Sequence, residues 1–98
     1  MFTTTTRQIE DILLAGLYKI STNSYRTSDG IELDVFTAPT TVDGHSEDEL
    51  YFDFAEDDIA CPASLGVDVL ARIRYDRGYT NVRPDLKPYE MEGVITSR

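Results

Sequence analysis

The spacing of the hydrophobic residues changes once along this chain of 98 residues, at the polar segment 21–24, and that change limits the folds open to it. Before the segment, apolar and small residues recur at helical spacing, at Ile9, Ile12, Leu13, Gly16, Leu17 and Ile20. They form one stripe, so we expect a helix from about Thr6 to Lys19. Thr5 and Gln8 have the spacing of a capping box at its start. Gly16 would cost such a helix about 1 kcal/mol relative to Ala, which a close backbone contact would explain.

After the polar segment, apolar residues alternate with polar ones, as in strands with one buried face. Residues 25–27 and 31–37 flank Ser28-Asp29-Gly30, and this pattern predicts a hairpin with a glycine-containing turn. On its second strand Ile31, Leu33 and Val35 share one face, and Glu32, Asp34 and Phe36 share the other. Either that strand is covered on both faces or Phe36 is an exposed anchor for a partner.

The segment from Ala38 to Asp48 contains Pro39, Gly44 and several small polar residues, and we expect a loop there. Residues 50–54 alternate again, which predicts a strand with a clear inner face. A second loop is expected over residues 56–62.

Two structures fit Val67 to Tyr75. The odd-numbered positions are mostly apolar, as in a strand, whereas a helix opened by Pro62 and closed at Gly78 would be lined by Val67, Leu70, Ala71 and Arg74. The β-branched content and the turn at residues 76–78 favour a strand, paired in a hairpin with residues 79–83. Beyond it we expect an irregular link and a short last strand, marked by Pro84 and Pro88 and by Tyr89, Met91 and Val94.

These elements predict an α+β fold, in which one N-terminal helix packs on an antiparallel sheet of about five strands. We expect a single domain over residues 1–98. A chain of this length buries roughly 60–65 % of its unfolded surface, which is enough for one core and leaves no room for two.

The charged residues are segregated along the chain. From Thr27 to Ala71 there is no Lys or Arg. The same stretch holds twelve acids: Asp29, Glu32, Asp34, Asp43, Glu47, Asp48, Glu49, Asp53, Glu56, Asp57, Asp58 and Asp68. The rest of the chain carries all nine Lys and Arg and six acids, so it is mildly basic although the net charge is −9.

Acids at this density have two interpretations. They form a solvated face with no further role, or they face a cationic partner that compensates for their mutual repulsion. On the second interpretation the partner-binding residues are the acids of the strands and flanking loops, namely Glu32, Asp34, Glu47, Asp48, Glu49, Asp53, Glu56, Asp57 and Asp58. Their carboxylates would replace phosphates in the basic, nucleic-acid-binding surface of another protein.

In its size, its acidic charge and its lack of a catalytic signature, the chain resembles the small acidic phage or mobile-element proteins that block nucleic-acid-binding defence machinery, as anti-restriction and anti-CRISPR inhibitors do. The resemblance implies a non-enzymatic inhibitor that mimics DNA. The alternative is a structural or assembly component, such as a phage virion protein, that docks through Tyr and Phe. A third possibility, a small enzyme, would need a cleft joining His45 or Cys61 to perturbed carboxylates.

No pattern predicts a catalytic residue, a metal site or a cofactor. His45 has acidic neighbours without the spacing of an EF-hand loop, so we expect an exposed loop. Cys61 is the only cysteine, which excludes an intramolecular disulfide and favours a small core residue. A basic strip with interleaved tyrosines superficially suits nucleic acid, but we expect its cations to pair with the chain's own acids. The strip consists of Arg72, Arg74, Arg77, Arg83 and Lys87.

The environment of the protein is predicted from the same features. An acidic surface repels nucleic acid and anionic membranes, so we expect no direct binding to either. The first apolar run follows Glu10 and Asp11 rather than a basic region, unlike a signal peptide. No run approaches the ~18 apolar residues of a membrane span. We therefore expect a cytoplasmic protein.

Overall fold

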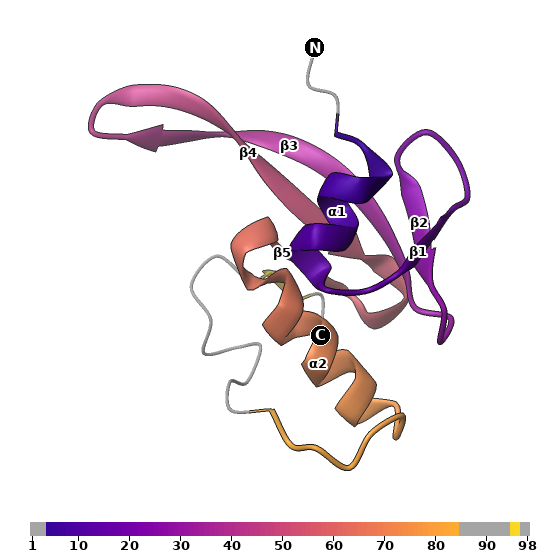
Figure 1. Ribbon diagram of the computed structural model, residues 1–98. Coiled ribbons are helices and arrows are strands. Elements are labelled where there is room, and N and C mark those ends of the chain that lie inside the picture. The colour runs from indigo at the N-terminus through magenta and orange to yellow at the C-terminus, as the bar shows by residue number, and fades with distance from the viewer. Residues whose placement is uncertain (1–3, 85–94, 97–98) are drawn as a thin grey trace.

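The computed structural model describes residues 4–84 and 95–96, without the side chains of 42, 95 and 96. Within these residues the fold is α+β, as predicted: an antiparallel sheet with its strands in sequence order, and two helices on one of its faces (Figure 1). In chain order the elements are α1 (Thr6–Leu13), β1 (Leu17–Lys19), β2 (Ser24–Thr27), β3 (Glu32–Val42), β4 (His45–Phe54), the 3-10 turn η1 (Ala55–Asp57), β5 (Ile59–Pro62), the 3-10 turn η2 (Ala63–Leu65), α2 (Gly66–Asp76) and β6 (Ile95–Thr96).

The core lies between the sheet and the two helices. The helices contribute Ile9, Leu13, Val69, Leu70 and Ile73, and the sheet side contributes Tyr25, Ile31, Leu33, Val35, Phe52, Phe54, Ile59 and Cys61. Successive strand residues point to opposite faces, so burying this set leaves the alternate residues of β2, β3 and β4 on the face away from the helices. We call this second face of the sheet the outer face. Neither helix in the described segments is long and apolar enough to cross a membrane.

Helix α1 is shorter than predicted. The capping box at Thr5 and Gln8 is present, but the helix ends at Leu13 because Leu14 adopts a left-handed conformation, with φ 54°. The side chain of Glu10 then accepts a hydrogen bond from the Leu17 N–H at 2.9 Å, which fixes the chain reversal. Residues 17–19 therefore form strand β1 rather than the last turn of a helix. Gly16 lies in the reversal, where added side-chain atoms would meet only Glu10 at 3.9 Å, so the expected close backbone contact is absent.

The predicted hairpin at residues 25–37 is confirmed. Strands β2 and β3 pair antiparallel, and Gly30 has φ 89° in the turn between them. The turn is held by the buried Thr27, whose hydroxyl accepts from the Ile31 N–H at 3.0 Å and donates to the Asp29 carboxylate.

The loop predicted from Ala38 to Asp48 is wrong, because this segment belongs to a long β-hairpin. β3 and β4 stay paired out to Val42 and His45, and a two-residue turn at Asp43 and Gly44 joins them, with φ values of 50° and 80°. These are the positive angles that Asp-Gly hairpin turns require. Pro39 is tolerated because β2 pairs with β3 only as far as Asp34, so the missing N–H lies on an open edge. The distal half of the hairpin, residues 38–49, projects from the body as an arm (Figure 1).

The strand favoured for Val67 to Tyr75 is also wrong. These residues lie in helix α2, whose buried positions are Gly66, Val69, Leu70 and Ile73. These positions recur at spacings of three and four residues, as the buried positions of a helix do. Each of them precedes by one residue a position that the helical alternative placed on its apolar stripe. Gly66 is required by the packing, since a Cβ there would lie 2.7 Å from the ring of Phe52.

The structure also differs from the sequence prediction on either side of α2. No strand forms over residues 79–83, which follow α2 as irregular chain. The loop predicted over 56–62 instead contains η1 and strand β5, which pairs with β4. The predicted link at Pro88 and strand at Tyr89, Met91 and Val94 lie outside the described residues, although β6 does pair with β5 just beyond them.

Candidate partner-binding face

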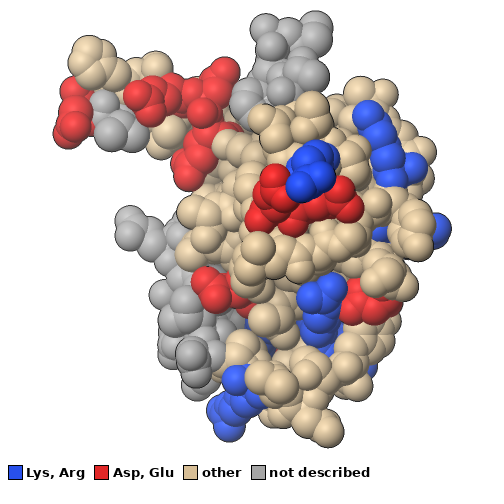
Figure 2. All heavy atoms as spheres, in the orientation of Figure 1, with Lys and Arg blue, Asp and Glu red and all other residues tan. Residues whose placement is uncertain are grey.

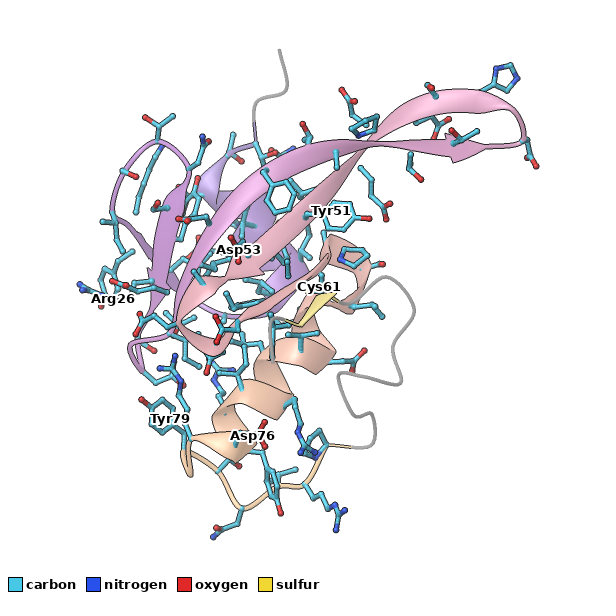
Figure 3. All side chains as sticks on the ribbon, turned by 180° about the vertical axis from the view of Figure 1, so that it is seen from behind. Arg26, Tyr51, Asp53, Cys61, Asp76 and Tyr79 are labelled. Atoms are coloured by element: carbon cyan, nitrogen blue, oxygen red, sulfur yellow. The ribbon has the colours of Figure 1, made fainter. Side chains whose placement is uncertain are left out.

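The outer face is organised by the register between β3 and β4. Asp34 lies directly opposite Asp53, and Phe36 lies directly opposite Tyr51. Directly opposed residues point to the same side of a sheet, so each pair forms one rung of side chains on the outer face. Figure 3 views the molecule from this side, and its labels mark Asp53 and Tyr51 on β4 and Arg26 on β2, toward the β1 edge of the sheet.

Four carboxylates surround a shallow depression of about 80 Å³ at the base of the hairpin. Its lining consists of Glu32, Asp34, Asp53 and Glu56, with Leu33 and Ala55. Burial, and then the charge of Asp34, raise the pKa of Asp53. A hydrogen bond with Glu32, and then the charge of that carboxylate, raise the pKa of Glu56. These carboxylates repel one another, and no Lys or Arg of the described chain forms an ion pair with any of them.

Further acids continue along the arm. Glu49 and Glu47 lie opposite Ala38 and Thr40, on the same outer face as Asp53. Asp48 lies between them in sequence and therefore points to the other side of the ribbon. Figure 2, which shows the helix side of the molecule, has acidic atoms along the arm from its tip to its base. The arm thus carries negative charge on both of its sides.

An aromatic rung, formed by Phe36 and Tyr51, lies between the Asp34–Asp53 pair and the acids of the arm. The rings of Phe36 and Tyr51 stack with their centroids 5.4 Å apart and an angle of 21° between their planes. Phe36 keeps 41 % of its surface exposed. It is thus an exposed aromatic residue, although its neighbour across the hairpin covers one side of it.

One candidate residue is engaged inside the protein. Asp57 forms a bidentate ion pair with Arg77, at 2.6 Å from Nη2 and 3.2 Å from Nε, and both side chains are largely buried. This pairing ties η1 to the end of α2, so Asp57 is not available to a partner in the way its sequence position suggested. Asp58 takes a left-handed conformation with φ 56°, and its N–H donates to the Ala55 carbonyl to end η1.

Most of the predicted basic strip pairs internally, as expected. Arg72 contacts Asp76 at 3.1 Å on α2, and Arg74 contacts Asp29 at 2.7 Å in the β2–β3 turn. Burial acts to raise the pKa of Asp29, but hydrogen bonds from Arg74 and Thr27 outweigh it and lower that pKa. Arg83 is exposed, and Lys87 lies outside the described residues. Arg72, Arg74 and Arg77 therefore form their ion pairs with Asp76, Asp29 and Asp57 rather than with the carboxylates around the depression.

The two residues considered for an enzyme are far apart. Cys61 is buried beside Phe52, and burial raises the pKa of its thiol to about 12, which suits a core residue rather than a nucleophile. His45 lies at the tip of the arm, seven residues along β4 from Phe52, or about 24 Å at the rise of a strand. Across the described residues, no group of three or more His, Cys, Asp or Glu side chains is arranged to hold a metal ion.

No protein-family model, no curated protein and no solved structure matches this chain. Any functional conclusion therefore depends on the site itself.

The sequence predicted part of this site. Alternation correctly placed Glu32 and Asp34 on one strand face and Tyr51 and Asp53 on another. The opposition of Asp34 to Asp53 and of Phe36 to Tyr51 was missed, because it depends on register. The Asp43-Gly44 dipeptide was the signal that could have revealed it, since a two-residue turn there determines every rung of the hairpin.

Proposed function

We propose that this chain is a non-enzymatic binding protein that inhibits a partner by occupying its basic, nucleic-acid-binding surface. The observation that carries the proposal is the row of carboxylates on the outer face and along the arm. These have no ion-pair partner among the described residues, whereas Asp29, Asp57 and Asp76 are each paired with an arginine. Carboxylates held on a β-ribbon are fixed acceptors for the guanidinium and ammonium groups of such a surface.

The density of charge limits how closely the face can imitate DNA. Six acids lie along the stretch from Glu47 to Glu56, namely Glu47, Glu49, Asp53 and Glu56 with Asp34 and Glu32 beside them. That stretch is about 30 Å long at the rise of a strand, which gives roughly one charge per 5 Å. Duplex DNA carries one per roughly 1.7 Å. Electrostatic attraction would therefore steer and orient the partner, and other contacts would supply part of the affinity.

The test compares two triple variants that raise the net charge equally. The outer-face variant is Glu47→Gln, Glu49→Gln and Asp53→Asn, and the control is Asp11→Asn, Asp68→Asn and Asp76→Asn, which lie on the two helices. Partners are captured from a host lysate at low salt, eluted at high salt and identified, and the affinity of each variant for the captured protein is then measured. We expect the outer-face variant to lose at least tenfold in affinity and the control to lose little. Equal losses in the two variants would refute the proposal.

A second candidate function is a structural or assembly component. Its support is the exposure of aromatic side chains, with Phe36 on the outer face and Tyr18 at 62 % exposed on β1. This function predicts self-association through those rings, independent of salt. Sedimentation of the chain as a monomer over a wide concentration range would exclude it.

A further inference from the structure

The aromatic rung on the outer face differs from the other aromatic pair of the sheet. Phe52 and Phe54 meet edge to face at 6.4 Å and are fully buried in the core. Phe36 and Tyr51 instead stack nearly parallel on the side of the sheet away from the helices. Their stack interrupts the carboxylates of the outer face, with the Asp34–Asp53 rung on one side and Glu49 on the other.

This arrangement favours a particular kind of cation. Same-face residues along a strand are ~7 Å apart, so a group lying over the aromatic rung is within reach of the carboxylates on both sides. An aromatic face attracts cations, and a planar guanidinium stacks on it while its N–H groups reach a carboxylate in the same plane. An ammonium group is a compact, strongly hydrated charge that gains less from a flat ring.

The described part of the chain combines a carboxylate and an aromatic ring around an arginine twice. Arg72 contacts Asp76 and lies 5.7 Å from the centre of the Tyr75 ring, and Arg77 is held in the same way. The guanidinium of Arg77 donates two hydrogen bonds to the Asp57 carboxylate, and its central carbon lies 5.9 Å from the centre of the Tyr79 ring. A carboxylate and an aromatic ring thus hold the same arginine at the end of α2. On the outer face both groups are present, and no arginine of the described chain forms an ion pair there.

We propose that Phe36 and Tyr51, with Asp34, Asp53 and Glu49 around them, form a docking site for arginine side chains of a partner protein. The inference rests on the proposed function and narrows it: the basic surface that this protein covers is rich in arginine rather than lysine. The carboxylates steer the partner to the outer face, and the aromatic rung discriminates between the two cations and contributes apolar contact area.

The experiment uses the full chain and two synthetic peptides of equal length and charge, one of alternating glycine and arginine and one of alternating glycine and lysine, both blocked at their ends. Amide resonances of the ¹⁵N-labelled protein are followed during titration with each peptide at low ionic strength. We expect the arginine peptide to bind more tightly and to shift the resonances of Phe36, Tyr51 and Asp53. A cation–π contact at an exposed site is worth two- to fivefold in affinity, at about 0.5–1 kcal/mol.

Three variants complete the test. Phe36→Leu keeps apolar volume but removes the ring, so it should abolish the two- to fivefold preference for arginine while leaving the weaker binding of the lysine peptide unchanged. Tyr18→Ala is the control, because Tyr18 is an exposed aromatic residue of β1 that lies opposite Arg26. It should keep the preference. Asp53→Asn should weaken both peptides alike.

The outcomes separate this inference from the proposed function. Equal binding of the two peptides, or an arginine preference that survives in Phe36→Leu, overturns the arginine site and leaves a purely electrostatic partner surface. Binding of neither peptide counts against both proposals. Shifts at Phe36 and Tyr51 that depend on protein concentration alone would identify a second copy of this chain as the occupant, and would also overturn the inference.

Discussion

Replacing Asp53 by asparagine should stabilise the folded protein. Asp53 lies directly opposite Asp34 in the β3–β4 register, and burial together with the Asp34 charge raises its pKa. Side chains that oppose each other directly have Cβ atoms ~5 Å apart, and two unit charges at about this distance repel by about 0.8 kcal/mol even in bulk water. Removing one charge should therefore increase the free energy of unfolding by about 0.5–1 kcal/mol. For a domain of about 100 residues this raises the Tm by roughly 2–5 °C.

The pH dependence gives an independent check on the cause. A raised pKa means that the folded state binds the Asp53 proton more tightly than the unfolded state, where the pKa is near 3.8. The wild-type protein therefore loses this part of its stability as the pH rises through the folded pKa, and the full penalty applies above it. Below pH 3.8 the carboxyl group is protonated in both states, so the wild type and Asp53→Asn should become equally stable.

Urea denaturation of both proteins at pH 3 and pH 7, followed by circular dichroism, measures the difference. Asp48→Asn is the matched control, because it changes the net charge equally but lies opposite Pro39 on the other side of the arm. At pH 7 the gain in the free energy of unfolding should be larger in Asp53→Asn than in Asp48→Asn by at least about 0.5 kcal/mol, since of these two residues only Asp53 faces a second acid directly. An equal gain in the two variants, or a gain at pH 7 that persists at pH 3, would show that repulsion between Asp34 and Asp53 is not the cause.

Three further predictions concern the body of the fold. Gly66→Ala should cost about 1–3 kcal/mol of stability in urea denaturation, because the added Cβ would lie 2.7 Å from Phe52; an unchanged midpoint would mean that α2 shifts freely on the sheet. Asp29→Asn should be less stable than the wild type at neutral pH, because Arg74 and Thr27 lower the pKa of Asp29. That difference should fade as the pH falls below 3.8 through the folded pKa, and denaturation at several pH values measures it. Cys61 should resist a thiol reagent at pH 8 in the folded protein and react in urea, since it is buried and its pKa is raised to about 12; rapid labelling of the folded state would contradict its place in the core.

The elements that the sequence predicted correctly are those with one dominant local signal. The β2–β3 hairpin has clear alternation and a Gly30 turn, and the start of α1 has a capping box. For residues 67–75 the strand was favoured over the helical alternative because Val67, Val69 and Ile73 fit a period of two. The burial of Gly66 against Phe52 and Leu13 and the burial of Leu70 distinguish the two periods, and both depend on tertiary contacts.

The candidate site shows the same division between local and distant determinants. Alternation alone placed Glu32, Asp34 and Phe36 on one face, and the structure agrees. The arm was missed because Pro39 and a polar composition suggested a loop, although both fit a ribbon whose two edges are open. The engagement of Asp57 by Arg77 was not predictable from the sequence, since it joins η1 to the end of α2 across twenty positions.

If the outer face takes the place of nucleic acid on a partner, the chain should displace nucleic acid from that partner in a competition assay. The captured partner is loaded with fluorescent nucleic acid, and the fluorescence anisotropy is followed as the wild-type chain, the outer-face triple variant or the helix triple variant is added. We expect the wild type and the helix variant to release the nucleic acid at similar concentrations, and the outer-face variant to need at least a tenfold higher concentration. If the nucleic acid stays bound in the presence of saturating wild-type chain, or if the outer-face variant releases it at the wild-type concentration, the outer face does not take the place of nucleic acid.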